Sequence, residues 1–229
     1  MSRYVLVFSK KGNMRFISHL DMQRLFRRIL YREEIKLAFS KGFNPHPLTN
    51  TVMPLSLGFE AERDYFEFET DVPYDAASLP ALLNPALPDG IEFIACREMP
   101  HEKKNLSAVC EYSEYSAFIP GFDITEDELN AFLSQDKIII LKRDKKTKTM
   151  VEKDVRDRIY SVSLPEDVPG GQIINMVINA ASNESLNPLQ LMNSLVKFRG
   201  KDIAPEDIRI TRKELYYTED GKLRSLFEK

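Results

Sequence analysis

The order of the expected secondary structure in the first hundred residues limits this chain to few folds. Short runs of alternating apolar and polar residues, typical of strands, are interrupted by two segments with helical periodicity. The segments follow one another as strand, helix, strand, strand, helix, strand, over residues 3–9, 18–34, 48–59, 64–70, 74–84 and 90–99. This order is the β-α-β-β-α-β plan of ferredoxin-like domains. The sequence therefore predicts an α+β domain over residues 1–100.

The second half repeats this plan with additions. Strands are expected at residues 107–119, 137–141, 151–164, 172–181 and 208–217, and helices at 126–134 and 188–198. The charged stretch Pro100–Leu106 is expected to be a linker. We therefore expect an α+β protein of two tandem ferredoxin-like (βαββαβ) subdomains with antiparallel sheets, in which the domains cover residues 1–100 and 107–229. The two halves share the order of their elements and no visible sequence repeat.

A stiff loop, Ser-Lys-Gly-Phe-Asn-Pro-His-Pro, occupies residues 40–47. Each proline fixes its own φ and pushes the preceding residue into extended geometry, whereas Gly42 can adopt a positive φ where the chain bends. Lys41, Asn44 and His46 are thus held on rigid backbone, which lowers the entropy cost of binding a ligand. The loop is a candidate binding site. The alternative is a rigid turn in which His46 only satisfies a neighbouring group.

The first helix carries a row of arginines. Its apolar stripe consists of Met22, Leu25, Phe26, Ile29 and Leu30. On another side, Arg24, Arg28 and Arg32 recur every four residues, where like charges repel one another. No acidic residue stands four positions before Arg28 or Arg32, so local ion pairs do not explain the row. Either an acidic part of the fold or an external anion is needed to balance it.

The charge distribution is uneven along the chain. Residues 1–50 carry ten Lys or Arg and three acidic residues, whereas residues 51–100 carry two and ten, and the whole chain has a net charge of −3. A basic segment on an acidic body steers an anionic ligand to one face, unless the two segments pair with each other. The pI of about 5.8 argues against strong non-specific binding of nucleic acid, so any such binding is expected to be local.

Several classes of activity lack their sequence signature. The chain contains no phosphate-binding loop of the usual kinds and no G-x-S-x-G motif. Cys96 and Cys110 are too few for a zinc ribbon or an iron–sulfur cluster. A metal site built from His19, Asp21 and His46 is not expected, because positions 19 and 21 of a helix point about 200° apart. We expect no metal and no cofactor. Without an export signal or a membrane-length apolar run, we expect a cytoplasmic protein with no membrane contact.

Binding of RNA or another anion is the chemistry that these residues favour. Arginine donates forked hydrogen bonds to phosphate, and Phe43 could stack on a base whose edge Asn44 reads. The candidate binding residues are Arg15, His19, Arg24, Arg28, Lys41, Phe43, Asn44 and His46. The basic hairpin at 142–153 is a candidate second contact. Two other hypotheses stay open: an RNA- or nucleotide-processing enzyme with His46 as general acid or base, and a subunit that binds only protein.

Three segments resemble a known family. Gly12–Asp21 with Arg24 and Arg28, then Gly42–Pro47, then Pro54–Gly58 are similar to the bacterial radical-SAM-linked protein family. That family is a domain of unknown function, found alone or fused C-terminal to radical SAM enzymes. The resemblance implies a bacterial protein with a link to RNA modification. Because this chain lacks a three-cysteine motif, it also implies that any radical SAM enzyme is a separate polypeptide, with which this chain would act as an RNA-binding accessory module.

Overall fold

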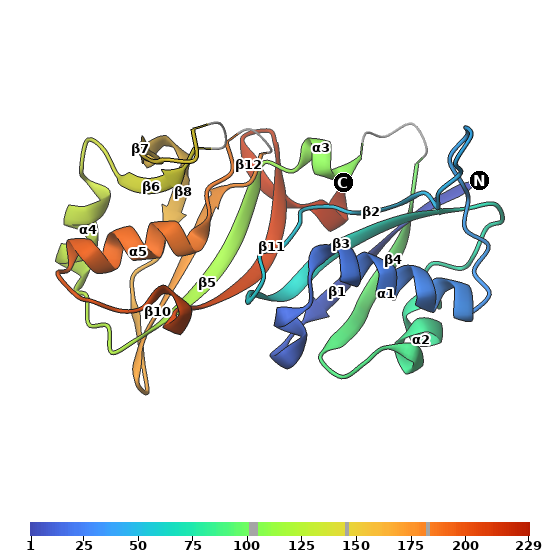
Figure 1. Ribbon diagram of the computed structural model, residues 1–229, viewed down its shortest axis with the longest axis horizontal. Helices are drawn as coiled ribbons and strands as arrows, with labels where there is room; N and C mark the ends of the chain where they lie inside the picture. The colour runs from blue at the N-terminus through green and yellow to red at the C-terminus, as the bar shows by residue number, and fades with distance from the viewer. Residues whose placement is uncertain (101–104, 145–146, 182–183) are drawn as a thin grey trace. The chain divides into compact units, whose positions relative to one another are not determined.

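The computed structural model describes residues 1–100, 105–144, 147–181 and 184–229. They form two compact units, each built from helices and antiparallel strands (Figure 1). Unit 1 contains Met1–Cys110 and Tyr217–Lys229, and unit 2 contains Glu111–Tyr216. The expected α+β class is confirmed. The C-terminal segment, which the sequence analysis placed in the second domain, belongs to unit 1 instead.

Unit 1 is a small sheet with helices inserted between its strands. Its elements are β1 (Ser2–Lys10), α1 (His19–Arg32), β2 (Thr49–Thr51), β3 (Glu60–Thr70), α2 (Leu79–Leu83), β4 (Ile91–Met99), α3 (Leu106–Val109) and β12 (Lys222–Ser225). The strands pair antiparallel in the order β4-β1-β3-β2. In this register Arg3 lies opposite Glu69, and Asn50 lies opposite Glu67.

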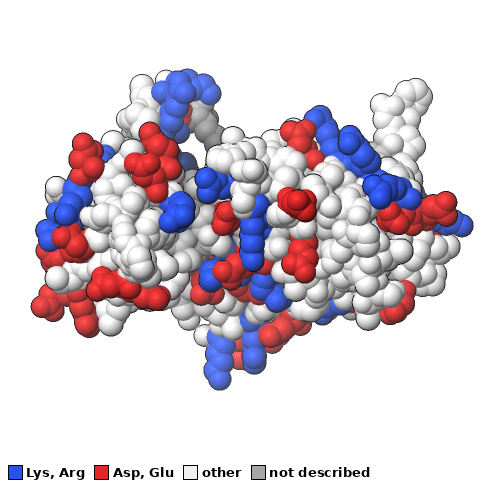
Figure 2. All heavy atoms as spheres, turned by 90° about the horizontal axis from the view of Figure 1, so that it is seen from below, with Lys and Arg blue, Asp and Glu red and all other residues white. Residues whose placement is uncertain are grey.

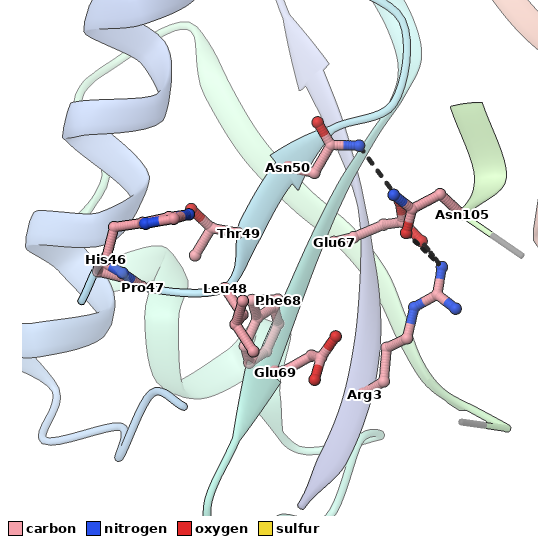
Figure 3. A pocket seen from close by; sticks show the side chains of 10 residues that line it. All are labelled: Arg3, His46, Pro47, Leu48, Thr49, Asn50, Glu67, Phe68, Glu69 and Asn105. Carbon is pink, nitrogen blue, oxygen red and sulfur yellow. Dashed lines mark hydrogen bonds and ion pairs between the residues drawn. The ribbon is translucent and has the colours of Figure 1, made fainter. Parts of the chain in front are cut away.

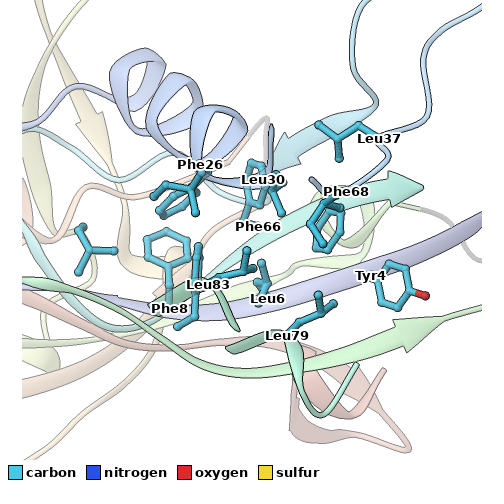
Figure 4. Close-up of a cluster of buried hydrophobic side chains, with 14 of the residues drawn as sticks. Tyr4, Leu6, Phe8, Phe26, Leu30, Leu37, Phe66, Phe68, Leu79 and Leu83 are labelled. Atoms are coloured by element: carbon cyan, nitrogen blue, oxygen red, sulfur yellow. The ribbon is translucent and has the colours of Figure 1, made fainter. Parts of the chain in front are cut away.

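The core of unit 1 lies between α1 and the sheet (Figure 4). Helix α1 begins where the Ser18 hydroxyl accepts a hydrogen bond from the backbone N–H of Asp21 at 3.2 Å. Its apolar stripe buries Met22, Phe26, Ile29 and Leu30, as the helical spacing predicts. Phe26 contacts aromatic rings of three strands, so the core fixes α1 on the sheet.

Unit 2 has the same pairing order. Its elements are β5 (Tyr112–Pro120), α4 (Glu126–Leu133), β6 (Ile139–Arg143), β7 (Met150–Asp154), β8 (Ile159–Val162), β9 (Glu166–Val168), β10 (Gly171–Asn179), α5 (Pro188–Phe198) and β11 (Arg209–Glu219), whose last three residues belong to unit 1. The strands pair in the order β11-β5-β10-β8, which corresponds to the order β4-β1-β3-β2 of unit 1 when the β6–β7 hairpin and the short strands β9 and β12 are set aside. The β6–β7 hairpin is an insertion between α4 and β8.

Several expected elements differ from the structure. The strand expected at 48–59 shrinks to β2, because Pro54 has no N–H to donate and Gly58 turns with φ +85°. The helix expected at 74–84 shrinks to α2, and the first residues of the strand expected at 107–119 form α3. Most of the expected linker, residues 101–104, lies outside the described residues. Nowhere in the described chain is there a helix long and apolar enough to cross a membrane.

Candidate functional site

The 40–47 loop is closed at its base by His46 and Ser40. The backbone N–H of Ser40 donates to the His46 carbonyl oxygen at 2.9 Å, and the N–H of His46 donates to Ser40 Oγ at 3.1 Å. Ser40 Oγ also lies 2.8 Å from Nδ1 of the His46 ring. Gly42 adopts a φ of +143°, as its expected place at the bend requires. The His46 ring therefore holds the loop in shape, with its Nε2 left for a ligand.

Phe43 stands at the tip of this loop, and its side chain is 100% exposed. Lys41 and Asn44 on either side are exposed too, and the described residues offer neither side chain a partner. Leaving a phenylalanine in water forgoes about 1.5–3 kcal/mol of burial free energy. The loop rises as a narrow projection at the upper right of Figure 1. It presents one aromatic ring, one cation and one amide to solvent on a braced backbone.

The arginine row of α1 is only partly paired within the protein. Arg24 forms an exposed ion pair with Asp21 at 2.8 Å, and Arg32 lies 3.4 Å from Glu33. Arg27 donates to Thr49 Oγ1 at 2.7 Å, which ties α1 to the strand that follows the loop. Arg28 is exposed and has no partner in the described part of the chain. A diagonal row of basic side chains crosses the upper right of Figure 2, the part of the molecule where α1 runs in Figure 1.

A polar pocket follows the loop along β2 (Figure 3). Its floor contains Arg3 and Glu67, which form an ion pair and are 5% and 4% exposed. Asn105 Oδ1 accepts from Arg3 at 3.4 Å, and Asn50 Nδ2 donates to Glu67 at 3.4 Å and to Ser107 Oγ at 3.1 Å. The pair joins the basic first segment to the acidic second one. Part of the charge asymmetry is thus balanced inside unit 1, but not by the arginines of α1.

A second cluster of polar groups lies at the start of α1. Lys10 and Asp64 are 4% and 2% exposed and line a cavity of about 20 Å³ with His19 and Thr51. Such a cavity holds about one water molecule. Thr51 Oγ1 is buried and has no hydrogen-bond partner among the described residues, so a water there would satisfy it. Burial lowers the pKa of His19, while the nearby Asp64 carboxylate acts to raise the pKa.

The lowered pKa of His19 predicts a pH effect on stability. Between the lowered pKa and the ordinary value of 6.5, the unfolded chain binds more protons at this position than the folded chain. The free energy of unfolding should therefore fall as the pH falls through 6.5. In His19→Gln this contribution should be absent, so the difference in urea midpoint between the variant and the wild type should depend on pH from 7 to 5. A pH-independent difference would contradict the assignment.

The structure separates the expected site residues into two groups. Arg24 and Arg28 lie on α1. The 40–47 loop leads into β2, which Arg27 of α1 anchors by its hydrogen bond to Thr49. Arg15 and His19 instead lie at the start of α1, where the Arg15 guanidinium covers the Phe16 ring at 4.8 Å. In the expected second contact at 142–153, residues 145–146 lie outside the described residues. The described residues contain no group of three or more His, Cys, Asp or Glu that could hold a metal.

The sequence analysis missed the polar groups that the strands bring together. These are Arg3, Lys10, Thr51, Asp64, Glu67 and Glu69. All of them except Lys10, which directly follows the strand expected at 3–9, stand in runs that were expected to be strands. Burial of a charged residue, however, depends on which strand lies beside it. The one available signal was charge, since Arg3 and Lys10 are basic and β3 is rich in acids. Cys96 is half-buried against the core, and burial raises the pKa of its thiol to about 12.

Several solved structures are similar to this chain at low sequence identity. A Cbf5-Nop10-Gar1 complex gives 9% identity and a TM-score of 0.49, covering 94% of this chain and 50% of that one. An H/ACA RNP bound to a substrate RNA containing 2'-deoxyuridine has 9% sequence identity and a TM-score of 0.46, and the match covers 95% of this chain and 47% of that one. An archaeal box H/ACA sRNP Nop10-Cbf5 complex has 11% sequence identity and a TM-score of 0.45, and the match covers 97% of this chain and 51% of that one. The chain spans about half the length of these solved chains.

No curated protein matches this chain. A family match, in contrast, covers most of it. The model of a family described as "Uncharacterized protein conserved in bacteria (DUF2344)" matches residues 3–188, which include α1, the 40–47 loop and both polar clusters. The chain therefore belongs to this bacterial family of uncharacterized proteins.

Proposed function

We propose that unit 1 binds single-stranded RNA through a loop–helix surface made of Arg24, Arg28, Lys41, Phe43 and Asn44. The observation that carries this proposal is Phe43, a fully exposed ring on a loop closed by hydrogen bonds. An unstacked base can lie on such a ring, and stacking contributes about 1–3 kcal/mol per base. Arg28 and Lys41 are exposed cations without partners in the described residues, and they suit the phosphates that flank a stacked base.

The proposal extends to a partner enzyme. The chain would act as an accessory module that presents RNA to a separate enzyme of the radical SAM type, as the sequence resemblance implies. The tandem ferredoxin-like architecture is part of the same proposal, and the shared pairing order of the two units supports it. Capture of such an enzyme by the tagged full chain, dependent on added RNA, would support the extension.

The surface can be tested by titrating labelled single-stranded RNA against the full chain and following its anisotropy. Phe43→Ala is expected to weaken binding about 5- to 150-fold, because one stacked base is lost. Arg28→Ala should reduce the slope of log K against log salt by about 0.7, since one phosphate contact of a single strand is lost. The salt slope of Phe43→Ala should equal that of the wild type.

Matched controls come from unit 2. Tyr160 is 53% exposed and Arg156 is exposed, so Tyr160→Ala and Arg156→Ala make similar chemical changes away from the proposed surface. Both should bind RNA as the wild type does. Wild-type affinity in Phe43→Ala and Arg28→Ala would show that RNA binds elsewhere or that the cations face an acidic protein. Absence of RNA binding by the full chain would refute the proposal.

The alternative hypothesis, that His46 is a general acid or base in an RNA- or nucleotide-processing enzyme, makes a separate prediction. Nδ1 of His46 is taken by Ser40, so only Nε2 could exchange a proton with a substrate. The hypothesis requires turnover of RNA or a nucleotide by the isolated chain. His46→Gln would then abolish turnover, whereas loss of RNA affinity without any turnover in the wild type fits the structural role of the ring.

A further inference from the structure

The pocket beside the loop has the size and the polarity of a site for one small ring. It is lined by residues of β2 and the segment before it, by β3, and by Arg3 and Asn105 (Figure 3). Its volume is about 160 Å³. That is far more than one water molecule needs, and less than the roughly 300–1,000 Å³ typical of pockets for drug-sized ligands.

One carboxylate in this pocket has no donor among the residues that the structure describes. Both oxygens of Glu67 are used, by Arg3, Asn50 and the backbone N–H of Leu106. Glu69 is half-buried on the same face of β3, and its carboxylate has no hydrogen bond or ion pair with any described residue. A partly buried carboxylate without a donor loses hydration that no group in the described part of the chain replaces. A ligand that donates a hydrogen bond would replace it.

The charges in the pocket select against phosphate. Among the described lining residues, Glu67 and Glu69 outnumber the single guanidinium of Arg3. Arg27 is not part of the lining and donates to Thr49. A phosphate would therefore meet net negative charge in the pocket, while the cations of the loop–helix surface lie outside it. A neutral group with N–H donors suits the pocket, and the phosphates of the same strand suit the surface.

We propose that the pocket holds one nucleobase of the bound strand and selects cytosine or adenine, which carry an amino group at C4 or C6, over uracil, which carries the carbonyl oxygen O4 there. The amino group donates to the Glu69 carboxylate, as amino groups of bases do to Glu and Asp elsewhere. At the position where cytosine carries its amino group, uracil carries the carbonyl oxygen O4. That oxygen would face the Glu69 carboxylate. This inference rests on the proposed RNA binding and adds which base the site takes.

The test compares single-stranded oligonucleotides of one length that contain only cytosine, only adenine or only uracil. The full chain should bind the cytosine and adenine strands at least about 10-fold more tightly than the uracil strand, the worth of one hydrogen bond to a charged group. Glu69→Gln should remove most of this difference, because the amide also donates to the uracil carbonyl. It should leave the salt slope unchanged. Glu98→Gln, an exposed acid on β4, is the matched control and should keep the preference.

Each failure of this test has a separate meaning. Equal, salt-dependent binding of all three strands would overturn the base preference and leave the loop–helix surface intact. A preference that survives Glu69→Gln would overturn the role of the pocket. If no strand binds, the proposed function and this inference both fail.

Discussion

Replacing Phe26 by alanine should destabilise unit 1 by about 3–5 kcal/mol, a large part of the roughly 5–15 kcal/mol that stabilises a typical domain. The Phe26 side chain is fully buried at the centre of the core. Its ring lies 4.9 Å from Phe8, 5.1 Å from Phe66 and 5.0 Å from Phe93, measured between centroids. Alanine would leave a cavity where α1 meets three strands. Since α1 carries Arg24 and Arg28, RNA affinity should be lost with the fold.

The measurement is urea unfolding followed by circular dichroism, with hydrogen exchange of β1 and β3 amides to report on unit 1. The exchange data are needed because a chain of two compact units need not unfold in a single two-state transition. Phe43→Ala makes the same chemical change at a fully exposed ring and should alter stability by less than about 0.5 kcal/mol. A Phe26→Ala protein whose β1 and β3 amides stay as protected as in the wild type would contradict this account of the core.

Features that depend on neighbours in sequence could be predicted. The start of α1 follows from Ser18 as its cap, and α5 begins at Pro188, where the sequence analysis placed it. The apolar stripe of α1 likewise identified its buried face. These predictions succeed because a cap, a proline at the first turn and a helical period act within a few residues.

Features that depend on strand pairing could not be predicted in the same way. The short strands β9 and β12 were missed, since three or four residues show no clear period without their partners. The return of the C-terminus to unit 1 also has no local signal. It rests on distant partners, since Phe227 lies under the guanidinium groups of Arg63 and Arg97.

The candidate site shows the same division. The bend at Gly42 was predicted from the spacing of glycine and prolines within eight residues, and the structure has it. The bond between His46 and Ser40 was foreseen only in the alternative hypothesis, in which His46 satisfies a neighbouring group in a rigid turn. The pocket was not predicted, because only the register of β1 on β3 places Glu69 opposite Arg3 and brings Glu67 beside them. Alternation shows which residues share a face of a strand, and the register decides which charges meet there.

Breaking the ion pair between Arg3 and Glu67 is expected to destabilise unit 1 by about 3–5 kcal/mol. Both side chains are about 95% buried and have lost most of their contact with water. Each charge therefore relies on the other to replace that lost hydration. Glu67→Gln keeps the shape and one acceptor oxygen but removes the carboxylate charge that faces the buried guanidinium of Arg3. The Asn50 amide and the backbone N–H of Leu106 also lose a charged acceptor. Urea unfolding of the variant measures the loss.

Two comparisons separate burial of the pair from its mere presence. The double variant Arg3→Met with Glu67→Leu should be more stable than either single variant, because two apolar side chains need no counter-charge. Arg24→Met breaks the exposed pair with Asp21, whose side chains are 69% and 53% exposed, and should cost less than about 1 kcal/mol. If Glu67→Gln costs no more than Arg24→Met, the pair is hydrated and the pocket above it is open to bulk water. In that case the carboxylate of Glu69 would keep its hydration too, and it would gain little from the amino group of a base.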